Sequence, residues 1–217
     1  MLGCSTHDPY APQGPRGAGD SYEFAWSNSA AEERPVGEVY PNIANILETE
    51  KPMLALYRED VTHRAVTEFF CDLAGSKRIA LPILYYADRH DLPLSLVFSV
   101  VWVESRFNPV ALNRNQQSID RGLFQLNSRS FPQLGLDDFF DPGVNARHGA
   151  GYLRFSLNQG RSWQRALAIY NAGLTRVRTD GVPESTQHYI RKVTRYRRQL
   201  EERFGAYIRD RFPLPST

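Results

Sequence analysis

One carboxylate of this chain occupies a position that favours acid–base chemistry. Glu104 follows the apolar run in "LPLSLVFSVVWVES", residues 92–105. A carboxylate at the end of a buried helix loses hydration, which disfavours its charged form and raises its pKa, and the negative end of the helix dipole acts in the same direction. A carboxyl group that stays protonated near neutral pH can act as a general acid on a leaving oxygen. The alternative is a solvated glutamate that only ends the run.

Two further polar clusters could share a site with Glu104. "DRGLFQLN", residues 120–127, carries the amides of Gln125 and Asn127, and "YNAG", residues 170–173, carries a phenol and an amide. Amides both donate and accept hydrogen bonds, which suits neutral polar ligands such as sugars. Helix ends that meet at one place commonly build such sites. The alternative for the second cluster is a helix cap that ends at Gly173.

Hydrophobic periodicity, caps and stop residues predict a mostly helical domain that positions these clusters. Asp91 is expected to cap the central helix and Pro93 to lie in its first turn, and apolar residues on every face predict that this helix is buried. A small irregular or β insert is expected after Glu104. The expected helices lie at 53–75, 77–90, 92–105, 141–160, 162–173 and 183–200.

Composition narrows the class of protein. The 217 residues have a net charge of +2, which does not favour nucleic-acid binding, and no apolar run reaches the roughly 18 residues of a membrane span. Two cysteines make no disulfide framework, and Cys71 is expected to be a small buried hydrophobe. His148 has no second ligand at metal spacing, so neither a metal nor a cofactor is expected. The basic stretch at 191–203 indicates attraction to an anionic wall or lipid, or only a solvated face.

Residues 1–50 are rich in Pro, Gly, Ser and charge, and they predict a disordered or extended tether before a domain at 53–212. Cys4 in "LGCS" resembles the lipid-attachment box of bacterial lipoproteins, so it is a candidate lipid anchor. The basic and apolar regions of such a signal do not precede it here. A late start, a trimmed signal or a chance match are the explanations left open.

Three motifs in order resemble the catalytic domain of the soluble lytic transglycosylases: "ESRFNP", "GLFQLN" and "AIYNAG". "PESTQHYI" loosely resembles a fourth motif, and the resemblance covers about residues 85–200. Each motif alone is modest, but four in register are specific. The resemblance implies a lysozyme-like α+β fold, mainly helical, with a central buried helix.

The resemblance also implies an activity in the bacterial envelope or periplasm. Such enzymes cleave the β-1,4 bond between N-acetylmuramic acid and N-acetylglucosamine in peptidoglycan and leave a 1,6-anhydro end, with Glu104 as the acid and then the base. Phe124 stands where the family usually has Met, and Asn113 where many members have Ser. The residues expected at the substrate are Ser105, Asn113, Asp120, Phe124, Gln125, Tyr170, Asn171 and Tyr189.

Two alternatives remain open. The stretch from Glu104 to Arg129 is also similar to the animal c-type lysozymes, in which a second carboxylate, matched here by Asp120, assists hydrolysis. Such a pair of carboxylates is a common arrangement for glycoside hydrolysis. Turn hydrogen bonds are expected to hold Asp120 and leave Glu104 working alone. The other alternative is a non-catalytic glycan-binding or scaffold module, which an ion pair from Glu104 to Arg106 or Arg129 would favour.

Overall fold

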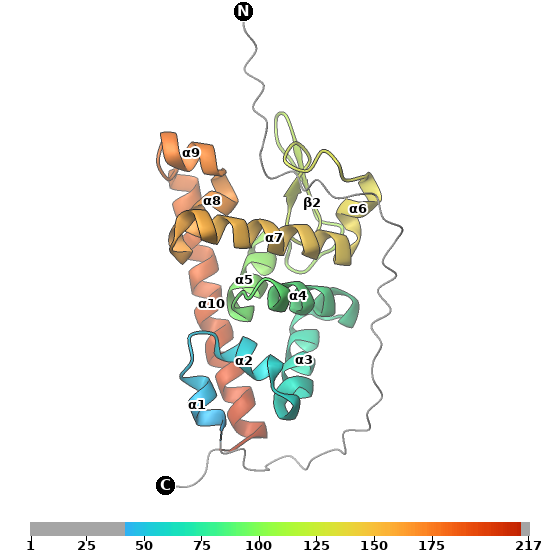
Figure 1. The fold of residues 1–217 in the computed structure, drawn as a ribbon. Helices are drawn as coiled ribbons and strands as arrows, with labels where there is room; N and C mark the ends of the chain where they lie inside the picture. Colours follow the sequence, from blue (N-terminus) through green and yellow to red (C-terminus); the bar gives the residue numbers. More distant parts are fainter. Residues whose placement is uncertain (1–41, 214–217) are drawn as a thin grey trace, which may run out of the picture.

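The structure is a computed structural model that describes residues 42–213, and this part is mostly helical with one small sheet (Figure 1). The predicted fold class is therefore confirmed. The helices and strands of the described part are α1 (Ile43–Leu47), α2 (Pro52–Arg58), α3 (Asp60–Ala74), α4 (Lys77–Arg89), α5 (Leu94–Ser105), β1 (Leu112–Arg114), β2 (Ile119–Arg121), β3 (Leu126–Asn127), α6 (Leu136–Phe140), α7 (Pro142–Gly160), α8 (Trp163–Ala172), α9 (Leu174–Thr179) and α10 (Glu184–Arg211).

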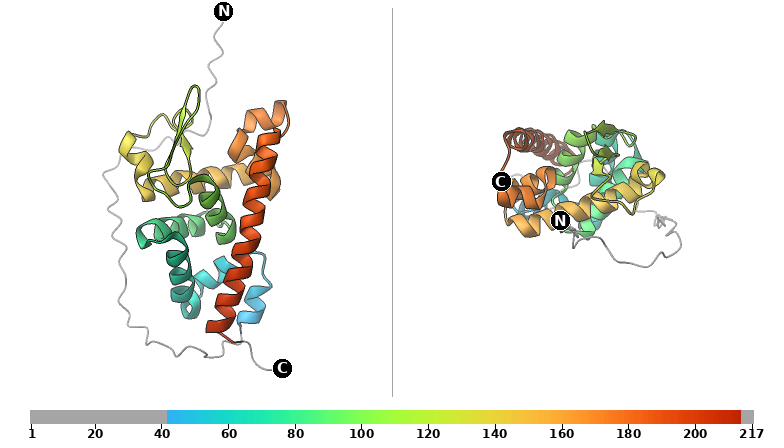
Figure 2. Two further views of the ribbon diagram at one scale, coloured as in Figure 1. Left: turned by 180° about the vertical axis from the view of Figure 1, so that it is seen from behind. Right: turned by 90° about the horizontal axis from the view of Figure 1, so that it is seen from above.

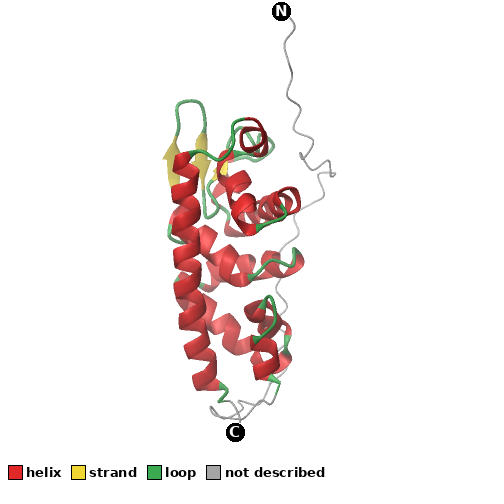
Figure 3. Cartoon of the chain, turned by 90° about the vertical axis from the view of Figure 1, so that its left-hand side faces the viewer, coloured by secondary structure: helices red, strands yellow, loops and turns green. Residues whose placement is uncertain are grey.

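Helix α10 connects the two ends of the described part. Its 28 residues correspond to about 42 Å of helix. It packs against α8 near its start, against α5 in the middle and against α3 towards its end. Figure 2 shows α10 crossing the molecule in front of the other helices, and Figure 3 shows it beside the whole stack of shorter helices, with the sheet at the far end.

Helix α5 is buried on all sides, as its uniformly apolar sequence predicts. The eight residues from Leu94 to Val101 are all buried, and the helix ends at Ser105. Arg106 and Phe107 follow with φ of 56° and 60°, the left-handed region that side chains with a Cβ rarely adopt. The chain therefore turns sharply directly after Ser105, the residue that follows Glu104.

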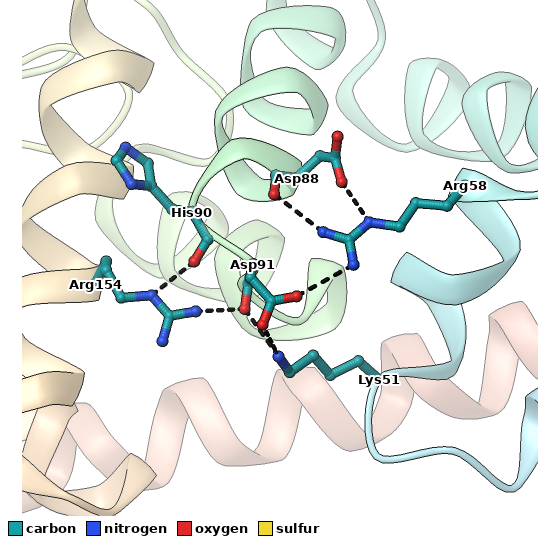
Figure 4. A network of polar contacts seen from close by, with 6 residues as sticks. All are labelled: Lys51, Arg58, Asp88, His90, Asp91 and Arg154. Atoms are coloured by element: carbon teal, nitrogen blue, oxygen red, sulfur yellow. Dashed lines mark hydrogen bonds and ion pairs between the residues drawn. The ribbon is translucent and has the colours of Figure 1, made fainter.

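The start of α5 differs from the prediction. Pro93, not Asp91, is the N-cap residue, and Asp91 has φ 50° in the turn before it. Asp91 is instead the centre of a polar network (Figure 4). Its carboxylate forms an ion pair with Lys51 and another with Arg58 at 3.2 Å, and its carbonyl accepts a hydrogen bond from Arg154. Because the Asp91 carboxylate pairs with Lys51 and Arg58, its side chain is not available as a cap.

The same network connects the turn between α4 and α5 to α2 and to α7. Arg58 Nε also donates to Asp88 Oδ1 over 2.6 Å, and Arg154 Nε donates to the His90 carbonyl over 2.6 Å. The turn between α4 and α5 is thus held from two sides.

The N-terminal boundary of the packed domain lies earlier than the sequence predicts. Residues 43–47 form α1, and Ile43 and Ile46 are buried in the main core, although they fall inside the predicted tether. A single pair of apolar residues three apart is too short a signal for periodicity. Residues 1–41 of the predicted tether, including Cys4, lie outside the described residues. Within residues 42–213, every helix is too short or too polar to cross a bilayer.

Other boundaries follow the predicted caps. Asp141 accepts from the Val144 N–H at 2.8 Å at the start of α7, and Ser162 accepts from the Arg165 N–H at 3.3 Å at the start of α8. The predicted helix at 53–75 is wrong in one respect, because extended backbone at Glu59 divides it into α2 and α3. The short helices α6 and α9 were not predicted.

The insert after Glu104 is a three-stranded antiparallel sheet in the order β1-β2-β3. Asp120 lies in the central strand, opposite Asn113 on one side and Asn127 on the other. Directly opposed residues project from the same face of a sheet. The polar side chains of the insert therefore form one row across it.

Candidate functional site

Glu104 lies in the last turn of α5 and is half-buried. Loss of hydration raises the pKa of its carboxyl from 4.5 to about 7. The Tyr189 hydroxyl opposes this rise, and the negative charge of Asp120 adds to it. Glu104 is therefore protonated in a large share of molecules at neutral pH, which is the state that a general acid requires.

Two tyrosines from separate helices flank the Glu104 carboxyl. Tyr189 comes from α10 and Tyr170 from α8, and burial raises both phenol pKa values well above 10, with Glu104 adding to the effect. The Tyr189 hydroxyl is buried and faces Glu104, although the contact falls outside ordinary hydrogen-bond geometry and no other partner lies within residues 42–213. Both phenols stay protonated, so they can only donate or accept hydrogen bonds here.

Neither arginine near the site neutralises Glu104. The Arg106 guanidinium lies over the Trp102 ring, 3.2 Å from its centroid, and Arg129 donates to Gln117 Oε1 at 2.7 Å. Glu104 forms no ion pair with any residue of the described chain. The observation that would have favoured an idle module is therefore not found.

Asp120 is held by amides from both neighbouring strands and from the loop. The side-chain nitrogens of Asn115 and Asn127 donate to it at 2.7 Å each, and that of Asn113 does so at 3.4 Å. Hydrogen bonds hold Asp120 as expected, and they come from the cross-strand partners Asn113 and Asn127 and from Asn115 in the loop between β1 and β2. Asp120 is close enough to Glu104 for its charge to act on the acid.

Gln125 lies at the corner that leads into β3. Its φ is 49°, and its side-chain nitrogen donates to the carbonyls of Gly122 at 2.9 Å and Ala111 at 3.2 Å. The amide therefore joins the two sides of the insert, and its oxygen is the atom left to meet a ligand. Gln125 is half-buried.

Two residues expected at the substrate are buried supports. Ser105 is 7% exposed, and its hydroxyl donates to the Val101 carbonyl within its own helix at 3.1 Å. Phe124 is 1% exposed, and its carbonyl accepts from the Tyr170 hydroxyl at 2.9 Å. Protein atoms cover both side chains almost completely. They position the site instead.

Asn171 and Asn113 occupy more open positions. Asn171 is exposed at the end of α8, and its side-chain oxygen accepts from Thr186 at 2.8 Å, which joins α8 to α10. Asn113 is exposed on β1 and its nitrogen is directed to Asp120. The structure brings Asp120, Tyr170 and Tyr189 to Glu104, while Asn171 and Asn113 hold elements around it.

Asn145 of α7 is a site support that the sequence analysis missed. It is 1% exposed, accepts from the Phe124 N–H at 2.8 Å, and donates to the carbonyls of Phe139 at 2.8 Å and Arg121 at 3.1 Å. A Cβ on Gly122, which has φ 76°, would lie 2.3 Å from Asn145. An asparagine in the expected helix at 141–160 was the only signal in the sequence, because its burial depends on what packs above it.

Among the described residues, no three side chains of His, Cys, Asp or Glu gather as metal ligands. His148 instead lies edge-on to Phe131, with ring centroids 5.7 Å apart. The acid, the two phenols and the hydrogen-bonded aspartate are therefore the chemical groups that the site offers.

Several known proteins are similar to this chain. Residues 82–191 match the family model of the transglycosylase SLT domain. The IpgF proteins of Shigella sonnei and Shigella flexneri are each 32% identical to this chain over 94 residues. These residues cover 40% of this chain and 61% of each IpgF protein. An inactive mutant of the lytic transglycosylase Slt from Pseudomonas aeruginosa covers 80% of this chain and 39% of its own at 20% identity, with a TM-score of 0.48. This chain spans less than two thirds of the length of each of these relatives. Because the family model matches just over half of the chain, the chain belongs to the transglycosylase SLT domain family.

Proposed function

We propose that this chain is a peptidoglycan lytic transglycosylase that cleaves the β-1,4 bond between N-acetylmuramic acid and N-acetylglucosamine. The family assignment supports the reaction class. The observation that carries the proposal is the carboxyl of Glu104, whose pKa is raised to about 7 and which has no cationic partner in the described chain. An acid that stays protonated without a charge partner is poised to donate its proton.

The proposed reaction has two proton transfers through one residue. The Glu104 carboxyl protonates the glycosidic oxygen, and N-acetylglucosamine leaves as an alcohol while the bond to C1 of the muramic acid breaks. The resulting carboxylate then accepts the proton of the C6 hydroxyl, whose oxygen bonds to C1. The product carries a 1,6-anhydro ring, Glu104 regains its proton and no water is consumed.

Other residues have supporting roles in this proposal. Tyr189 lies against the carboxyl and Tyr170 fixes the Phe124 carbonyl, so both hold the surroundings of the acid in place. The amides of Gln125 and Asn171 are the groups proposed to meet sugar hydroxyl and acetamido groups. The substrate places the protein in the bacterial envelope, with Cys4 as a proposed lipid anchor.

The test is a digest of purified peptidoglycan by the full chain, with the products weighed by mass spectrometry. Glycan fragments lighter by one water than hydrolysis products are expected, and Glu104→Gln is expected to lower the rate by at least about a hundredfold because it cannot supply the proton. Circular dichroism of the variant controls for folding. Products that form equally well with a folded Glu104→Gln protein would reject the assignment of Glu104.

Hydrolysis of the same bond with help from Asp120 is a second candidate function. The observation that favours it is the nearby charge of Asp120, fixed by three amides. Such an enzyme would release ordinary reducing ends, and Asp120→Asn would abolish them. In the transglycosylase, Asp120→Asn is expected to lower the rate but leave the anhydro product unchanged. The ratio of the two products therefore separates the candidates.

A further inference from the structure

A cavity of about 330 Å³ lies where the end of α7 meets the start of α8 and residues 50–51. Volumes of this size are common for sites that bind small molecules. Leu157 and Trp163, both half-buried, contribute apolar surface to its lining. The other lining residues are polar or charged, so the cavity offers hydrogen-bonding groups beside an apolar wall.

The cavity is separate from the candidate catalytic site. Trp163 begins α8, whereas Tyr170 lies near the end of that helix, about 10 Å further along its axis. Lys51 and Arg154 of the lining bind Asp91 in the turn before α5 (Figure 4). The candidate acid lies in the last turn of α5, about 15 Å along the axis from the start of the helix. A ligand of this cavity therefore lies at the opposite ends of α5 and α8 from the acid.

Two arginines line the cavity without an acidic partner. Arg154 and Arg161 are spaced at i and i+7, which places them on the same side of α7 and its C-terminal end. The backbone carbonyls of His90 and Asp91 accept from Arg154 and fix its guanidinium, but they do not neutralise its charge. Arg161 is exposed, has φ 59°, and forms neither a hydrogen bond nor an ion pair with any residue of the described chain.

The charges that line the cavity sum to a positive value. Lys51 joins the two arginines, although its ion pair with Asp91 satisfies part of its charge. Glu50 is the one carboxylate of the lining, and it is exposed and pairs with none of these cations within residues 42–213. Three cations and one carboxylate in a hollow with an apolar wall attract an anion more strongly than the same charges spread over a flat surface.

The remaining polar groups indicate the kind of anion. The Ser162 oxygen accepts from the Arg165 N–H at 3.3 Å, so its hydroxyl proton is left to donate. Gln164 is exposed at the cavity and carries a side-chain amide that can donate as well. Donors thus come from α7, from the start of α8 and from residue 51. A terminal phosphate presents three oxygens to such a set and carries up to two charges, whereas a carboxylate presents two oxygens and one charge.

We propose that this cavity binds a terminal phosphate group, with the guanidinium groups of Arg154 and Arg161 as its main partners. Arginine suits this role because its planar fork binds two phosphate oxygens at once. The group belongs either to a soluble phosphate or to a lipid headgroup such as that of phosphatidic acid. This binding is independent of the proposed function, because no residue of the lining lies at the candidate acid.

The test is a titration of the full chain, labelled with ¹⁵N, with sodium phosphate at constant ionic strength. The indole N–H signal of Trp163, identified by its loss in Trp163→Phe, is expected to shift along a saturating curve. Arg161→Gln is expected to weaken binding at least about fivefold, because it removes a charged donor. Arg165→Gln is the matched control, since it removes an exposed arginine of α8 that does not line the cavity, and it should bind as the parent does.

The same titration contains the results that would overturn the proposal. A shift that does not saturate, or an equal loss of affinity in Arg161→Gln and Arg165→Gln, would exclude a phosphate site in this cavity. Sodium acetate is expected to bind at least about threefold more weakly than phosphate, and equal affinity would reject phosphate as the preferred anion.

Two further probes distinguish the sources of the phosphate. Glycerol 1-phosphate represents a soluble ester, and vesicles of phosphatidic acid and phosphatidylcholine in equal amounts represent a lipid surface. Sedimentation with the vesicles that is lost in Arg161→Gln and kept in Arg165→Gln would assign the site to the headgroup. Binding of glycerol 1-phosphate without sedimentation would assign it to a soluble phosphate, and binding of neither probe would overturn the proposal.

Discussion

Opposing effects set the pKa of the Glu104 carboxyl. Loss of hydration and the charge of Asp120 favour the neutral carboxyl, while the Tyr189 hydroxyl favours the carboxylate. The balance leaves the pKa at about 7. A group that must first give and then take a proton works best near such a midpoint, because neither form is then strongly preferred.

The raised pKa of Glu104 predicts how activity and folding stability each depend on pH. In the proposed reaction, kcat/KM is expected to fall as pH rises through about 7, because Glu104 of the free enzyme loses the proton that it would donate. The folded state holds this proton more tightly than the unfolded chain, so its stabilising contribution is complete below pH 4.5 and is lost as pH rises through about 7. Glu104→Gln keeps the neutral group at all pH values.

Thermal melts of both proteins from pH 4 to 8.5 check the second part. The melting temperature of Glu104→Gln relative to that of the parent is expected to rise with pH across this window. A constant difference would show that Glu104 titrates in the folded protein as it does in a peptide.

Tyr189→Phe removes the group that favours the carboxylate. The pKa of Glu104 is then expected to rise, so the alkaline limb of the pH–rate profile should move to higher pH, and kcat should fall on the order of tenfold through looser placement of the acid. Stability should change little, because the buried hydroxyl has no ordinary hydrogen bond in the described chain.

Tyr207→Phe is the control on the same helix. Its hydroxyl donates to the Ala65 carbonyl at 3.0 Å, so this variant should lose about 1 kcal/mol of stability and leave the pH limb in place. A limb that does not move in Tyr189→Phe would mean that the hydroxyl does not act on Glu104.

Some residues of this site could be predicted from the sequence, and the contacts of the others could not, for a physical reason. Glu104 could be predicted because an acid after a long apolar run is a local pattern. Its contact with Tyr189 could not, because the crossing of α5 and α10 brings the two together from distant parts of the chain. The buried positions of Ser105 and Phe124 were likewise invisible, since exposure depends on what packs above a residue.

At the scale of elements, helix α7 supports the segment between β2 and β3. Asn145 binds its backbone, and the Phe124 ring packs onto the helix where Gly149 leaves space. A Cβ at Gly149 would lie 2.1 Å from the Phe124 ring, closer than atoms can approach. The glycine at position 149 is therefore required by this packing.

Gly149→Ala is expected to destabilise the protein by about 1–3 kcal/mol, because the ring must shift in a packed interior. The same shift displaces the carbonyl that Tyr170 binds, so activity should fall as well. Gly151→Ala is the matched control two residues on, where the nearest atom is His90 Nε2 at 3.7 Å. It should be neutral or stabilise by up to about 1 kcal/mol through helix propensity. Thermal melts and the digest compare the two, and equal effects would contradict the packing argument.

Local chemistry predicted some elements and not others. Asp141 and Ser162 fixed the starts of α7 and α8 because their caps act within one turn. Helices α1, α6 and α9 have five or six residues, too few for an amphipathic period to appear. The Asp91 cap failed because partners from other elements compete for that carboxylate.

At the scale of the whole molecule, the residues before α2 belong to the folded domain. Ile43 is fully buried and Ile46 is 6% exposed, and Lys51 pairs with Asp91. A chain that starts at residue 53 is therefore expected to melt about 5 °C or more below one that starts at residue 42, because it exposes core surface. The exposed ion pair contributes little to this difference.

Ile43→Ala in the full chain checks the same surface without truncation, and it should lower stability by about 2–4 kcal/mol. Equal melting temperatures for the two truncated chains would place α1 outside the cooperative unit.

The fixed ends of α5 have a consequence for the time course of a reaction. One end is held at the Asp91 turn by cations from two sides, and the other by the sharp bend at Arg106 and Phe107. Amide hydrogens in the middle of this helix should exchange only when the entire protein opens. The Glu104 carboxyl is thus held in place on the scale of a catalytic cycle, so in the proposed function the glycan strand has to move until its glycosidic bond reaches the acid.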